Sequence, residues 1–91
     1  MTDDERLLDE LRPFAFAIAY RMLGSVSEAE DVIQEALLRV HQAMQAGEEI
    51  ASPRAYVATV TTRLGINELR SRRVAARAHH HRRPRRSGPK R

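Results

Sequence analysis

The sequence has no cysteine, no long apolar run and no basic N-terminus, and each absence narrows the possible classes of protein. Without cysteine, neither a disulfide framework nor a thiolate metal site can form, which suits a reducing cytoplasm. The longest apolar run, from Phe14 to Tyr20, is far shorter than the roughly 20 residues that span a bilayer. The N-terminus is acidic, unlike a secretory signal. We therefore expect a soluble cytoplasmic protein with no membrane partner.

The residue groupings that catalysis or metal binding requires are also missing from the sequence. It contains no glycine-rich phosphate loop and no pairing of a nucleophile with a base, and its acids lie on expected helix faces. His79, His80 and His81 are adjacent, and adjacent residues of a helix point about 100° apart, so their imidazoles cannot converge on one ion. We expect a non-enzyme without metal or cofactor.

The net charge of +4 conceals two halves of opposite charge. Up to Ala51, four arginines stand against eleven acids, which gives −7; from Ser52 onward, twelve basic residues stand against Glu68 alone, which gives +11. A chain divided in this way can face two partners of opposite charge. Arginine supplies 15 of the 16 basic residues, and its planar guanidinium suits phosphates and base edges. Nucleic acid is therefore an expected partner of the second half.

Apolar periodicity predicts two helices in the first half of the chain. The first runs from Asp3 to Leu23 and ends at Gly24. Pro13 interrupts its pattern, so this segment is either one kinked helix or two consecutive helices. The tetrapeptide Ser27–Glu30 has the form of a capping box and predicts the start of the next helix, which runs to about Gln45.

A third helix and a tail are predicted in the second half. Residues 46–51 read as a loop, and Ser52 followed by Pro53 is a helix start signal. The helix should run through Arg73 and into Ala78, while 79–91 read as a disordered basic tail. A chain of 91 residues forms at most one domain, which we place at 1–78. The expected fold is all-α, a bundle of three or four helices with a disordered basic C-terminal tail.

Two helix faces are candidate interaction surfaces. On the second helix, residues spaced i, i+3, i+4 and i+7 lie away from the apolar face: Asp31, Gln34, Glu35 and Leu38. On the third helix, a polar and basic arc lies opposite the apolar one: Thr59, Thr62, Arg63, Ile66, Asn67, Arg70 and Arg73. Arginines can neutralise phosphates, and an asparagine can read a base edge. From the residues alone, an ordinary solvated face remains an alternative for each.

Two segments, FAIAYRMLGSVSEAEDVIQEALLRVHQ and SPRAYVATVTTRLGINELRSRR, resemble region 2 of bacterial sigma factors of the extracytoplasmic-function group. The resemblance covers about Leu8 to Arg73. It implies a helical domain that docks on the clamp helices, a coiled coil of the largest subunit of core RNA polymerase. It also implies capture of the single-stranded non-template strand of the minus-ten promoter element.

The same resemblance implies roles for individual residues. The stripe Asp31, Gln34, Glu35 and Leu38 would bind polymerase, and Arg63 and Asn67 would face promoter DNA. Independently of the resemblance, the chemistry of the basic arc adds four candidate DNA contacts: Thr59, Thr62, Arg70 and Arg73. The loop between the second and third helices would form a pocket for an extruded base, which we assign to Glu49, Ile50, Ala51 and Ser52. We expect Tyr56, just beyond this loop, to offer the base an aromatic neighbour.

Two other functions are compatible with the sequence. Region 4, the second helical domain of such sigma factors, does not follow in these 91 residues. The chain could therefore be a regulatory module that occupies polymerase or an anti-sigma factor without directing initiation. It could also be a general nucleic-acid binder that depends on the tail, in which case deletion of 79–91 would abolish binding.

Overall fold

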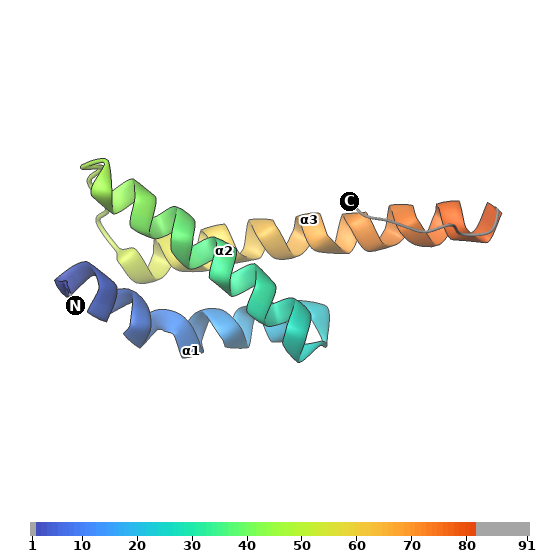
Figure 1. The fold of residues 1–91 in the computed structure, drawn as a ribbon, viewed down its shortest axis with the longest axis horizontal. Coiled ribbons are helices and arrows are strands. Elements are labelled where there is room, and N and C mark those ends of the chain that lie inside the picture. The colour runs from blue at the N-terminus through green and yellow to red at the C-terminus, as the bar shows by residue number, and fades with distance from the viewer. Residues whose placement is uncertain (1, 82–91) are drawn as a thin grey trace.

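The structure, a computed structural model, describes residues 2–81, and this part of the chain forms three helices (Figure 1). They are α1 (Asp3–Leu23), α2 (Val26–Gln45) and α3 (Pro53–His81). Each helix packs against the other two. The predicted all-α bundle is confirmed, with three helices rather than four in the described part. None of the three is long and apolar enough to cross a membrane.

The first helix, α1, is capped at both ends and runs through Pro13 without a break. Thr2 and Glu5 form a capping box, in which the Thr2 hydroxyl accepts from the Glu5 amide and the Glu5 carboxylate accepts from the Thr2 amide, both at 3.1 Å. Gly24 ends the helix with φ 70°, the left-handed conformation that glycine favours. The alternative of two separate helices is wrong. Leu11 and Ala15 are buried on either side of exposed Pro13, and their packing outweighs the lost hydrogen bond.

The second helix, α2, begins two residues before the predicted capping box. Its N-cap is Ser25, whose hydroxyl accepts from the Glu28 amide at 3.3 Å, while Ser27 already lies inside the helix. Because Gly24 reverses the chain directly after α1, Ser25 is the next residue in an extended conformation and takes the capping role. The capping box predicted at Ser27 is therefore wrong. The predicted end at Gln45 is confirmed.

The third helix, α3, begins where the sequence predicts and continues to His81. The Ser52 hydroxyl accepts from the Ala55 amide at 3.2 Å, which confirms Ser52 as the cap and Pro53 as the first helical residue. The helix extends three residues beyond the predicted end at Ala78, so 79–81 are helical. The remainder of the predicted tail, 82–91, lies outside the described residues.

Small side chains allow the three helices to pack closely. Ala15, Ala19 and Ala29 are fully buried in the core, where larger side chains would push the helix axes apart. Gly65 lies against α1, and a Cβ atom at this position would come within 2.7 Å of the Met22 sulfur. The larger core residues come from all three helices: Leu8, Leu11, Leu23, Val32, Ile33, Leu37, Val40 and Val57.

Candidate functional site

The four residues predicted to face polymerase form an exposed row along α2, which we call the α2 ridge: Asp31, Gln34, Glu35 and Leu38. Their neighbours Ile33 and Leu37 are buried in the core, so the helix is held with the ridge toward solvent. Leu38 is 52% exposed, although leucine is usually buried. The structure therefore places an uncovered apolar side chain among polar and acidic ones.

The α2 ridge separates two sets of hollows. On the α1 side, Gln34 lines two neighbouring hollows of about 530 and 460 Å³, and Leu38 lines the second of these. On the α3 side, Asp31 and Glu35 line a hollow of about 250 Å³. The uncharged half of the ridge thus faces α1, and the charged half faces α3.

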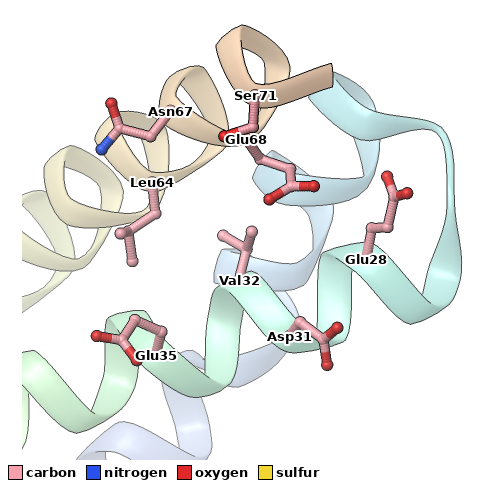
Figure 2. Close-up of a pocket in the computed structure, with 8 residues that line it drawn as sticks. All are labelled: Glu28, Asp31, Val32, Glu35, Leu64, Asn67, Glu68 and Ser71. Carbon is pink, nitrogen blue, oxygen red and sulfur yellow. The ribbon is translucent and has the colours of Figure 1, made fainter. Parts of the chain in front are cut away.

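The hollow on the α3 side, which we call the α2–α3 groove, is acidic (Figure 2). It is lined by Glu28, Asp31, Val32, Glu35, Leu64, Asn67, Glu68 and Ser71. Glu35 pairs with Arg39 at 2.9 Å, and Glu28 pairs with Arg72. Asp31 and Glu68 form no ion pair with the described side chains of residues 2–76, so this part of the groove keeps a net negative charge. Such a groove favours a cationic side chain and disfavours a phosphate.

The basic arc predicted to bind DNA lies on the outer face of α3, but it does not form one continuous surface. Thr59, Thr62 and Arg63 line a shallow hollow of about 350 Å³ together with Ala58. Arg70 and Arg73 are exposed further along the helix. Asn67 is also exposed, yet it lines the α2–α3 groove instead. The structure therefore places Asn67 between the predicted DNA face and the acids of α2.

The loop predicted to hold an extruded base connects α2 to α3, at the end of the molecule opposite the junction between α1 and α2 (Figure 1). Ile50 is half-buried, whereas Glu49, Ala51 and Ser52 are exposed. The Ser52 hydroxyl accepts from the backbone of α3. Tyr56 is half-buried and packs against the core rather than standing free in solvent. The base pocket remains a prediction.

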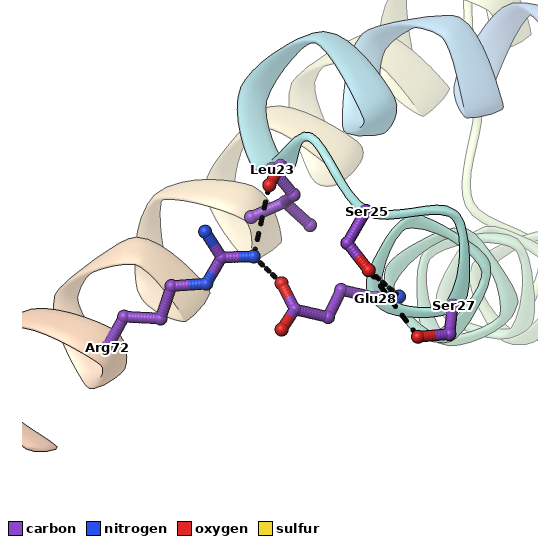
Figure 3. Close-up of polar contacts among 5 residues, drawn as sticks. All are labelled: Leu23, Ser25, Ser27, Glu28 and Arg72. Atoms are coloured by element: carbon purple, nitrogen blue, oxygen red, sulfur yellow. Dashed lines mark hydrogen bonds and ion pairs between the residues drawn. The ribbon is translucent and has the colours of Figure 1, made fainter.

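Sequence reasoning did not single out Arg72, which joins all three helices (Figure 3). Its guanidinium donates to the carbonyl of Leu23 at 3.1 Å and forms an ion pair with Glu28. One signal was available, because Arg72 lies seven residues after Gly65 and so falls on the inner face of α3. Its partners could not be found from spacing, because Glu28 is 44 residues away in the chain.

Comparisons with known proteins confirm the family resemblance that the two sequence motifs indicate. The family described as sigma-70 region 2 matches residues 7–74. The extracytoplasmic-function RNA polymerase sigma factor SigJ of Mycobacterium tuberculosis is 44% identical over 63 residues, which are 69% of this chain and 19% of SigJ. The sigma factor SigL of the same organism is 40% identical over 68 residues, 74% of this chain and 38% of SigL. No solved structure matches the chain.

Proposed function

The chain belongs to the sigma-70 region 2 family, and from this membership we propose that it binds core RNA polymerase through α2 and the melted minus-ten promoter strand through α3. The chain spans 19% of SigJ and 38% of SigL. We therefore state the activity of a whole sigma factor only as a proposal for this chain. One observation carries it: two exposed faces of opposite charge lie on different helices of a single bundle. Catalysis stays with the polymerase, and the chain acts in the cytoplasm.

The composition of the α2 ridge supports docking of a basic helical partner. Leu38 offers apolar area for burial, and Asp31 offers a carboxylate without an ion pair in the described part of the chain. Glu35 already shares its charge with Arg39, so Asp31 is the stronger anchor for an incoming arginine. The partner that we assign to this surface is the coiled coil of clamp helices on the largest polymerase subunit. Carboxylates at its edge would act mainly on orientation and on the rate of association.

The outer face of α3 supports binding of a single strand by its phosphates and bases. Arg63, Arg70 and Arg73 form no ion pair within residues 2–81, so phosphates need not displace a carboxylate from them. The acidic α2–α3 groove repels phosphates, which keeps the strand on the outer face. At the border, Asn67 is neutral and can read a base edge there. We assign an extruded base to the loop of Glu49, Ile50, Ala51 and Ser52.

Charge reversal on the α2 ridge tests the polymerase half of the proposal. We expect Asp31→Lys to weaken binding to an isolated clamp-helix fragment at least about tenfold, since like charges would then meet at the interface. The measurement is a titration of the labelled fragment at fixed ionic strength. Glu10→Lys is the matched control, because Glu10 is an exposed helical acid on α1 and gives the same change in net charge.

Two results would decide against the assignment. If Asp31→Lys bound the fragment as tightly as the unaltered chain does, the α2 ridge would not be the docking surface. If Glu10→Lys weakened binding as much as Asp31→Lys, the effect would come from net charge and not from a local contact.

A further inference from the structure

The position of Arg72 differs from that of the exposed arginines of the predicted basic arc, Arg63, Arg70 and Arg73. We propose that Arg72 is a positioning residue, which fixes α3 to the junction of α1 and α2 and does not itself contact nucleic acid. The inference rests on the proposed function, because it concerns how α3 is held for the promoter strand. It goes beyond that function because it distinguishes Arg72, which holds the helix in place, from the arginines of the outer face, which bind phosphates.

The contacts of Arg72 reach the other two helices at the point where they meet (Figure 3). Leu23 is the last residue of α1, and its carbonyl is one of those that a helix end leaves without an intrahelical donor. The guanidinium of Arg72 donates to this oxygen at 3.1 Å. Glu28 lies in the first turn of α2 and forms the ion pair with the same terminal nitrogen. We call these contacts of Arg72, Leu23 and Glu28 the Arg72 clasp.

The Arg72 clasp lies where α3 leaves the bundle. Leu69 still packs against the core, and Arg72 is partly covered by its partners. Residues 73–76 are all exposed, and α3 then runs past the junction of α1 and α2 (Figure 1). Arg72 is therefore the last residue with a described side chain that ties α3 to the rest of the molecule. Among the described side chains, the attachment of the helix would end one turn earlier without it, at Leu69.

Arg72 also differs from its neighbour Arg73 in that its guanidinium forms an ion pair with Glu28. Arg73 is exposed and forms no ion pair within the described residues. A phosphate at Arg73 would release counterions and gain affinity, whereas a phosphate at Arg72 would first have to displace Glu28. The two adjacent arginines thus carry the same formal charge but have different roles.

The Arg72 clasp also bounds the α2–α3 groove. Glu28 belongs both to the clasp and to the lining of the groove, which it shares with Asn67 on the facing helix (Figure 2). By holding Glu28, Arg72 fixes the separation of α2 and α3 at this end. Because Asn67 is only five residues before Arg72, a change in the clasp shifts the amide that we assign to base reading.

A double-mutant cycle in thermal unfolding tests whether the clasp exists in solution. We expect Arg72→Gln to lower the melting temperature by about 5 °C, the effect of losing one good interaction in a domain of this size. Glu28→Gln should have a smaller effect when Arg72 has already been replaced than when it is present. Arg73→Gln, the matched control, should leave the melting temperature unchanged.

Measurements of nucleic-acid binding then distinguish three possible roles of Arg72. It could position α3, contact the nucleic acid itself, or only add stability. The probe is a labelled single-stranded oligonucleotide selected for binding to the unaltered full chain, compared with a scrambled oligonucleotide, well below the melting temperature. Arg73→Gln should lower the slope of log affinity against log salt by about 0.7, the value for one phosphate of a single strand, and keep the preference for the selected sequence. Arg72→Gln should keep the slope and lose most of that preference.

Each remaining outcome has a definite meaning. If Arg72→Gln lowered the salt slope as Arg73→Gln does, Arg72 would be a phosphate contact and the proposal would be wrong. Additive effects in the unfolding cycle, or an unchanged sequence preference in Arg72→Gln, would also overturn it. If the unaltered chain preferred no sequence, the proposed function would fail instead, and the unfolding cycle would still decide whether the clasp exists.

Discussion

Thr61 shows how one core residue can be fully buried without having its polar atom satisfied. Its side chain has 0% exposure on the inner face of α3, and its hydroxyl has no hydrogen-bond partner within the described part of the chain. A buried hydroxyl without a partner loses its hydrogen bonds to water on folding and gains none in return. Thr61 therefore lowers the stability of the bundle at a position where an apolar side chain of the same shape would fit.

Replacement of Thr61 by valine should stabilise the protein. We expect Thr61→Val to raise the free energy of unfolding by about 1 kcal/mol, because a methyl group takes the place of an unsatisfied hydroxyl. In a domain of this size the melting temperature should rise by about 4–8 °C. Thr59→Val, at an exposed position of the same helix, serves as the control and should have little effect. A destabilised Thr61→Val chain would mean that the hydroxyl is hydrogen-bonded in solution.

Exposure of single residues followed from helical periodicity, whereas their contacts did not. The exposed α2 ridge and the buried positions of α3, such as Val57 and Thr61, lie where a 3.6-residue repeat places them. The pairing of Glu28 with Arg72 depends on how two helices pack, which no local spacing contains. The same limit applies to Asn67, because only the packing of α3 on α2 places it beside acids.

At the scale of whole elements, the start of α2 shows how two nearby serines compete for one role. Ser25 and Ser27 both precede the apolar face of the helix, and their hydroxyl oxygens lie 3.4 Å apart. The pattern Ser27–Glu30 fits a capping box, but the geometry of the chain after Gly24 favours Ser25. The competition was decided by the tight connection between α1 and α2, which sequence patterns do not encode.

Alanine substitutions distinguish the two serines directly. We expect Ser25→Ala to lower the free energy of unfolding by about 1 kcal/mol, since the amide of Glu28 would lose its side-chain acceptor. Ser27→Ala should change it by less than about 0.5 kcal/mol, the usual range for a surface position. Chemical denaturation followed by circular dichroism measures both values. A larger loss from Ser27→Ala than from Ser25→Ala would restore the capping box predicted from the sequence.

Helix boundaries were predictable where strong local signals and packing agreed. Ser52 and Pro53 start α3 as expected, and Gly24 ends α1 as expected. Pro13 was ambiguous, because proline costs about 3 kcal/mol inside a helix and only tertiary packing can offset such a cost. The burial of Leu11 and Ala15 supplies that packing, and no property of the local sequence reveals its size.

At the scale of the whole molecule, folding turns the charge division of the sequence into separate faces. The acidic half forms α1 and α2, and the described portion of the basic half forms α3. Counting charges along the sequence was enough to predict two partners of opposite charge. It could not predict the acidic α2–α3 groove, where Glu68 of the basic half joins Asp31 of the acidic half. This groove forms the border between the surface proposed for polymerase and the surface proposed for DNA.

The most direct test of the central claim is whether the chain joins polymerase to a single strand through two separate faces. Core RNA polymerase is immobilised, and its capture of a labelled single-stranded oligonucleotide is measured with and without the chain. The oligonucleotide is one selected for binding to the unaltered full chain. We predict that the unaltered chain increases capture. The double variant Asp31→Lys, Glu35→Lys should abolish this increase but leave oligonucleotide binding in solution intact. The double variant Arg63→Gln, Asn67→Ala should also abolish the increase but leave polymerase binding intact. Unchanged capture with either double variant, or loss of both partners from one of them, would contradict the account.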